Sequence, residues 1–169
     1  MDAGHPRVQG GGDASPLPKG TEMKAYRFFA YLIAVEVVLQ ASFIAFGVFG
    51  ETKWIEDDGG VLNKAVLDAD KHPTFTGAIG YGLHFLNGMM LIPLIAVIFL
   101  IVAFFAKVPS GAKWAAIVLL LVVVQVAMGL SGIVWLGPLH GINAFILFGT
   151  AVMAGKRATA APASVPAAV

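Results

Sequence analysis

The stretch GAIGYGLHFLNGMMLIPLIAVIFLIVAFFA, residues 77–106, carries no charged side chain and His84 as its one imidazole. A helix needs about 20 mostly apolar residues to cross the hydrocarbon core of a bilayer. Three further apolar runs, residues 25–49, 113–136 and 139–155, accompany this stretch in the sequence. The sequence therefore predicts an all-α integral membrane protein, in which residues 23–157 form one bundle of four transmembrane helices.

The composition supports this class of protein. Hydrophobic residues make up 58% of the chain and charged residues 12%, with a formal net charge of +1. The absence of cysteine excludes disulfides, thiolate metal sites and cysteine redox chemistry. No basic run of the kind that binds nucleic acid is present. The expected partners are the lipid bilayer and, beyond it, a membrane redox partner or a second copy of the chain.

Charge placement predicts the orientation of the helices. Seven basic residues flank the expected spans on one side: Lys19, Lys24, Arg27, Lys107, Lys113, Lys156 and Arg157. On the other side, Lys53, Lys64 and Lys71 are outnumbered by six acidic residues in the loop 50–73. The positive-inside rule then places both termini in the cytoplasm of a multi-pass cell-membrane protein, with the acidic loop 50–73 outside. Segments 1–22 and 158–169 lack apolar periodicity and are expected to be disordered. Gly137-Pro138 is expected to form the tight turn before the last helix.

One polar pattern occurs twice inside the apolar segments. LHFLNG at residues 83–88 and LHGINA at residues 139–144 share His-x-x-Asn, and the preceding helices carry Gln40 and Gln125 at matching places. This order indicates a duplicated helical hairpin whose halves are related by an axis along the membrane normal. Such an axis would bring the two histidines face to face.

Two facing histidines suggest haem. Neutral imidazoles ligate haem iron from both sides, and a helix bundle can enclose the ring. His84 and His140 would be the axial ligands of a b-type haem. The residues expected around the ring are Gly80, Gly88 and Gly141, which would leave room for it, and Phe85, Phe145 and Met89, which would pack on it. Counted along the helices, His84 lies about 34 Å and His140 about 24 Å above the basic flank, so the two are not obviously level. Different helix tilts or a kink at Pro93 could absorb much of this mismatch.

Other interpretations of the same residues remain open. The histidines could simply hydrogen-bond water or a neighbouring helix, and Gln40, Gln125, Asn87 and Asn143 could do the same within the bundle. Glu36 is the one acidic residue inside a predicted span, and it could be a proton relay, a support for the site or an uncharged interhelical hydrogen-bonder.

The chain as a whole could accordingly be a cofactor-free scaffold subunit or a small proton-coupled transporter. A metal pair of His72 with His84 is rejected, because twelve residues of continuous helix separate them by about 18 Å. His5 falls in the segment expected to be disordered.

Four helices in two hairpins, with one histidine near the outer end of the second and fourth, resemble one half of a heme A synthase. The resemblance covers about residues 25–155 and implies haem ligation by His84 and His140, next to a respiratory system, for electron transfer or haem handling. This chain has Tyr81-Gly82-Leu83-His84 where that family commonly has Glu-x-x-His, and it has no cysteine pair. The resemblance therefore gives little reason to expect oxidation of haem O.

Overall fold

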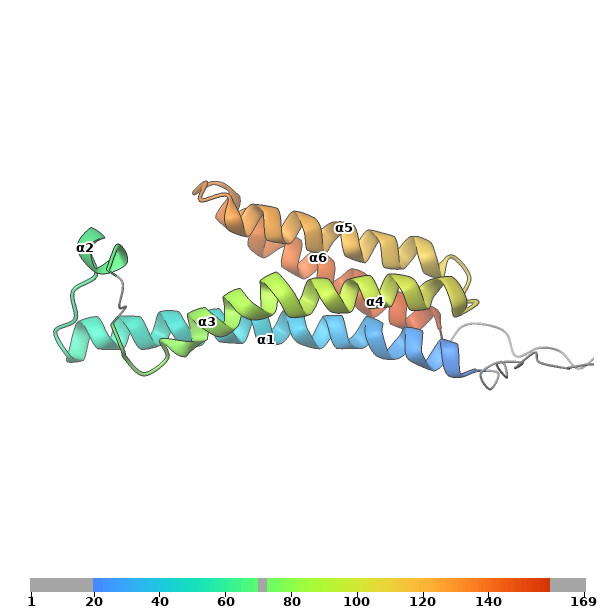
Figure 1. The fold of residues 1–169 in the computed structure, drawn as a ribbon, viewed down its shortest axis with the longest axis horizontal. Helices are drawn as coiled ribbons and strands as arrows, with labels where there is room; N and C mark the ends of the chain where they lie inside the picture. The colour runs from blue at the N-terminus through green and yellow to red at the C-terminus, as the bar shows by residue number, and fades with distance from the viewer. Residues whose placement is uncertain (1–19, 70–72, 159–169) are drawn as a thin grey trace, which may run out of the picture.

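The computed structural model describes residues 20–69 and 73–158. Four of its helices are long and apolar enough to cross a membrane (Figure 1). They are α1 (Thr21–Asp57), the continuous helix made of α3 (Ile79–Leu86), η1 (Asn87–Leu91) and α4 (Ile92–Phe105), then α5 (Gly111–Leu130) and α6 (Leu136–Arg157). A single turn, α2 (Lys64–Leu67), lies between α1 and α3, and the described residues contain no strand. The all-helical prediction with four apolar helices is confirmed.

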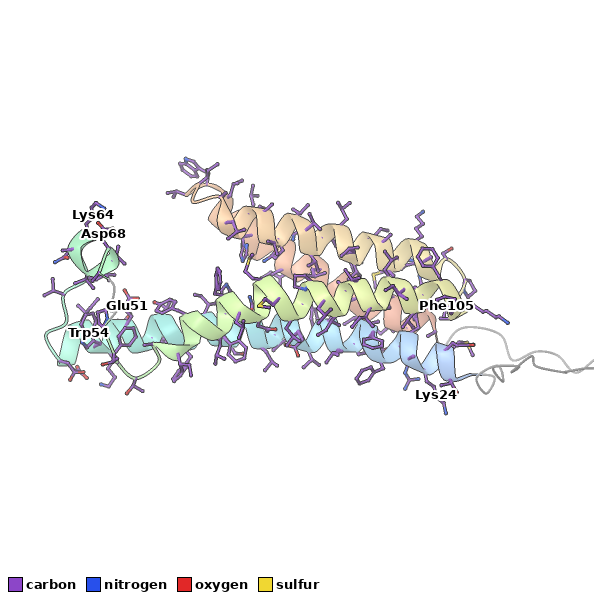
Figure 2. The ribbon with its side chains drawn as sticks, viewed as in Figure 1. Lys24, Glu51, Trp54, Lys64, Asp68 and Phe105 are labelled. Atoms are coloured by element: carbon purple, nitrogen blue, oxygen red, sulfur yellow. The ribbon has the colours of Figure 1, made fainter. Side chains whose placement is uncertain are left out.

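Each long helix packs against two neighbours, in the ring order α1, α4, α5, α6. Consequently α1 lies diagonally across the bundle from α5, and α4 from α6. We call the end where α1 begins, with Lys24 and the end of α4, the basic end (Figure 2). We call the opposite end, where α1 connects to α3 and α5 connects to α6, the loop end.

Close packing is concentrated toward the basic end. Tyr26 and Phe99 are fully buried, with ring centroids 4.8 Å apart, and the Tyr26 hydroxyl donates to the Gly111 carbonyl at 3.3 Å. Arg157 lies over the Trp114 ring at 4.5 Å. The helices approach closely here because their contact faces carry small side chains. These buried small residues are Ala30, Ala34, Ala96, Ala103, Ala106, Ala115, Ala151 and Ala154.

Toward the loop end the two hairpins separate. There α5 and α6 lean away from α1 and α3 (Figure 1). The α3 helix stays on α1 through glycines: a Cβ on Gly80 would lie 2.4 Å from the Phe43 carbonyl oxygen. The bundle is therefore closed at the basic end and open between hairpins at the loop end.

The second membrane-length helix contains one turn of π-helix, η1, directly after the first histidine motif. The Ile92 N–H donates to the Asn87 carbonyl, five residues back. Pro93 follows, and a proline has no N–H to bond the carbonyl four residues earlier while its ring crowds that carbonyl. A wider turn before the proline relieves this conflict, and such π turns are frequent at functional sites.

The expected end of the first helix at residue 49 is wrong, because α1 continues to Asp57. Gly50 does not interrupt the helix. The Thr76 carbonyl crosses α1 at this residue, and a Cβ on Gly50 would lie 1.9 Å from that oxygen. Trp54 stacks on Phe75 with centroids 5.4 Å apart, which holds this extension. Figure 2 shows Glu51 and Trp54 on the part of α1 that extends past α3. Residues 50–57 are thus helix rather than loop.

The expected turn at Gly137-Pro138 is also wrong. The third long helix ends at Leu130 rather than at residue 136, and Gly132, with φ +63°, reverses the chain. Gly137 and Pro138 then belong to the first turn of α6. Proline fits there because the first N–H groups of a helix have no intrahelical partner.

The segments expected to be disordered, 1–22 and 158–169, lie mostly outside the described residues, as do His5 and His72. Within the described part, Thr21 and Glu22 already belong to α1.

Candidate functional site

The opening between the hairpins contains a cavity of about 640 Å³ to which all four long helices contribute. Its walls are almost entirely apolar, and its polar side chains are those of Gln40, His84, Gln125 and His140. Phe85 and Phe145 line it and are 61% and 80% exposed, so the cavity opens laterally. Apolar cavities of this size with a few convergent polar groups are typical ligand sites.

Both histidines are held in the same way. Nδ1 of His84 lies 3.0 Å from the Gln40 carbonyl oxygen, and Nδ1 of His140 lies 3.1 Å from the Gln125 carbonyl oxygen. A carbonyl oxygen can only accept, so each Nδ1 carries the proton. In the neutral ring the Nε2 lone pair is then available, and neither Nε2 receives a hydrogen bond within residues 20–69 and 73–158. This is how proteins prepare histidines for metal ligation.

The two imidazole rings lie at the same level. Their centroids are 6.4 Å apart, with planes inclined by 50°. The difference in height between the two histidines, counted along the helices, is therefore wrong for the folded bundle. The count treated the helices as parallel rods, whereas the hairpin of α5 and α6 is inclined to that of α1 and α3 (Figure 1).

The Gln40 side chain supports the first histidine from behind. Its Nε2 donates to the His84 carbonyl at 2.7 Å, at the start of the switch to π-helix. Gly88 leaves room for that amide, since a Cβ there would lie 2.3 Å from Gln40 Nε2. Gly88 lines the cavity in which a haem ring was expected, and the Gln40 amide also lies against it.

The two asparagines of the repeated motif are buried, at 6% and 7% exposure. Asn143 Nδ2 donates to the Leu121 carbonyl at 2.9 Å and to Gln125 Oε1 at 2.6 Å. Asn87 Nδ2 donates to Glu36 Oε2 at 3.1 Å. Thus Gln40 and Gln125 contact the histidines directly, whereas the contacts of Asn87 with Glu36 and of Asn143 with Leu121 lie one turn closer to the basic end.

The two histidines and the apolar walls of the cavity fit the two faces of a haem. Two Nε2 atoms that lack a hydrogen-bond partner in the described residues, on two different helices, and apolar walls are what a bis-histidine haem needs. The cavity lining includes no Lys or Arg, so no side chain of the lining would pair with the haem propionates. Among the described residues no group of three or more His, Cys, Asp or Glu could hold a metal ion alone.

Replacing Gly88 with alanine tests the arrangement behind His84. The new methyl group would displace the Gln40 amide, which is the movable end of a side chain, so we expect the free energy of unfolding to change by less than about 1 kcal/mol. The hydrogen bond to the His84 carbonyl would be lost, which should shift the environment of the ring. The NMR chemical shift of the His84 ring nitrogens measures this. Unchanged shifts in Gly88→Ala would contradict the contact, and Gly149→Ala, with open space at its Cβ, is the control.

Sequence reasoning singled out the side chains of this site but missed two backbone features. The backbone carbonyls that orient the histidines cannot be identified from a pattern of side chains. Gly129 was also missed: a Cβ there would lie 3.2 Å from His140 Cε1, so this glycine makes room for the ring. The available signal was its position, one helical turn after Gln125 and on the same face of the helix.

Comparison of the chain with protein-family models, with curated proteins and with solved structures gave no match.

Proposed function

We propose that this chain is an integral membrane protein that binds b-type haem through His84 and His140. The observation that carries the proposal is the pair of imidazoles that share one apolar cavity, each with Nδ1 fixed on a backbone carbonyl and Nε2 available. Such fixed, neutral rings are suited to iron rather than to general acid chemistry, because their remaining nitrogen can donate only a lone pair.

The separation of the rings supports the same ligand. Imidazole–metal bonds are about 2 Å long, and the ring centre lies about 1 Å behind the nitrogen. Two imidazoles on opposite sides of one iron therefore have centres about 6 Å apart, and the centroids of His84 and His140 are 6.4 Å apart. The observed separation of the rings is therefore close to the one that a shared iron requires.

The hairpins α1–α3–α4 and α5–α6 carry corresponding bonds, which supports an origin by duplication. In each, the histidine bonds the carbonyl of the glutamine on the preceding long helix. In each, the asparagine three residues later reaches the residue four positions before that glutamine, Glu36 or Leu121. A site built from two copies of one hairpin has equivalent ligands on both faces of the haem.

When bound, the haem would supply one-electron redox chemistry. The chain itself would hold the ring between two neutral imidazoles, exclude water by its apolar walls and leave no open coordination position for a substrate. We therefore propose electron transfer or haem handling in the cell membrane, with no catalytic residue. The lateral opening gives a redox partner or a haem donor in the bilayer access to the ring edge.

Absorption spectroscopy on the purified protein tests the proposal. Protein produced with sufficient haem should show the narrow reduced bands of low-spin b-type haem, at about one haem per chain by iron analysis. A colourless preparation, or haem that washes out with detergent, would overturn it. In that case the hydrogen bonds of the histidines would serve only to join the helices of each hairpin.

We also propose that the basic end faces the cytoplasm and the loop end faces outward. The natural chain has no cysteine, so single cysteines can report the orientation without background. A membrane-impermeant maleimide added to intact cells should label Asp58→Cys at the loop end. It should label Ser110→Cys, between α4 and α5, only after permeabilisation. The reverse pattern would contradict the orientation.

A further inference from the structure

A second polar cluster adjoins the histidine cavity on the side of the basic end and shares Gln40 with it. It consists of Glu36 and Gln40 on α1 and Asn87 at the start of η1. Glu36 and Gln40 are one turn apart on the same helix face. Asn87 touches Glu36 directly, with Nδ2 donating to Oε2 at 3.1 Å, while Gln40 bonds the carbonyl of His84, one turn before Asn87. All three side chains thus lie at one crossing between α1 and the second helix.

Two acceptor oxygens of this cluster lack a donor. Gln40 Oε1 and Asn87 Oδ1 are fully buried and receive no hydrogen bond from the described residues. Within a bilayer, where no bulk water replaces the missing donor, an unpaired buried oxygen is strongly unfavourable. The two oxygens can therefore still bind a partner that carries positive charge or donates protons.

The charge of the surroundings points to a cation as that partner. Glu36 adds a carboxylate to the two amide oxygens. Residues 73–106 and 114–155, which include the neighbouring helix spans, contain no Asp, Glu, Lys or Arg. Their titratable groups are Tyr81, bonded to Glu51 near the loop end, and His84 and His140, held by backbone carbonyls in the adjacent cavity. None of these groups supplies Glu36 with a counter-charge.

We propose that Glu36, Gln40 and Asn87 bind a small monovalent cation, either Na⁺ or a hydrated proton. Carboxylate and amide oxygens are the ligands that hard cations prefer. One carboxylate balances one positive charge, which favours a monovalent ion over a divalent one. The cation would satisfy both orphaned oxygens and neutralise Glu36 inside the bundle. This proposal does not depend on haem.

The second hairpin explains why there is one such site. There the position that corresponds to Glu36 is Leu121, and Asn143 bonds its carbonyl and the Gln125 side-chain oxygen. No carboxylate is present. The amide oxygen of Gln125 already has its donor, so the second hairpin needs no ion.

Thermal unfolding of the full-length protein, prepared without haem in detergent, tests the proposal. At mildly alkaline pH, NaCl should raise the Tm of the wild type by several degrees in a saturable manner, relative to choline chloride at equal ionic strength. Glu36→Gln should abolish the rise. Glu51→Gln, which removes a carboxylate elsewhere on α1, should keep it. If the ion is a hydrated proton, NaCl should have no effect and acidification should raise the Tm, again only while Glu36 is present.

A second measurement uses the wild type alone and decides the matter if Glu36→Gln fails to fold. Dicyclohexylcarbodiimide modifies protonated carboxyl groups in apolar surroundings, and mass spectrometry identifies the modified residue. Labelling of Glu36 that Na⁺ suppresses supports a sodium site, and labelling that rises only with acidity supports a proton site. A Tm and a labelling rate that respond to neither Na⁺ nor pH would overturn the proposal. A cation effect in a colourless protein would retain this site while refuting the haem.

Discussion

His84→Ala and His140→Ala should each eliminate the low-spin b-type spectrum. Removal of one imidazole leaves the iron with a single protein ligand, and the opposing ring cannot fill both positions. We expect haem content to fall at least tenfold, or the remaining haem to become high-spin with one open coordination position. Absorption and electron paramagnetic resonance spectra of the two purified variants measure the change.

Two controls separate ligation from damage to the fold. His5→Ala removes a histidine that lies outside the described residues and has no part in the proposed ligation, so this variant should keep the full spectrum. Added imidazole should restore a low-spin spectrum in the alanine variants if the pocket is intact, because it can occupy the vacated position. If either alanine variant kept wild-type haem content and spectrum, axial ligation by that residue would be refuted.

Phe99→Ala should produce a large loss of stability. Phe99 is fully buried and packs on Tyr26 at the closed basic end. Lipid is as apolar as the core, so the transfer part of the cost is small and the unfilled cavity dominates. At about 24 cal/mol per Å³ and roughly 100 Å³ of lost volume, the free energy of unfolding should fall by about 2 kcal/mol. Denaturation in mixed micelles, followed by the fluorescence of Trp114, gives this value.

Phe105→Ala is the matched control, because this phenylalanine lies on the same helix and is 65% exposed (Figure 2). It should change the free energy of unfolding by less than about 0.5 kcal/mol. Equal effects of the two substitutions would show that the bundle does not close around Phe99.

The sequence predicted the four helices well because a span is determined by uninterrupted apolar length, a local property. It misplaced the end of α1, which is held by contacts with a distant segment, and the end of α5, where Gly132 reverses the chain. Gly50 remains helical because the Thr76 carbonyl passes over it, and Trp54 is held by Phe75. Pro138 signals a turn in isolation, yet it also fits the first turn of a helix.

For the candidate site, the repeated His-x-x-Asn pattern identified both histidines and their polar neighbours as residues that should meet. It could not give their relative level, since that depends on the inclination between hairpins. It also could not show that the histidines are held by backbone carbonyls, or that Gly88 serves the Gln40 amide. The two unpaired oxygens of Gln40 and Asn87 likewise emerge only from three-dimensional packing.

The unequal packing along the bundle has a consequence for its biogenesis. The alanine-rich contacts at the basic end involve all four long helices and none of the cavity's polar residues. On the proposed function, the four helices would therefore assemble in the membrane before haem binds. A flat ligand could then enter sideways between hairpins that are already joined at their base, so maturation would be a late step that requires no unfolding.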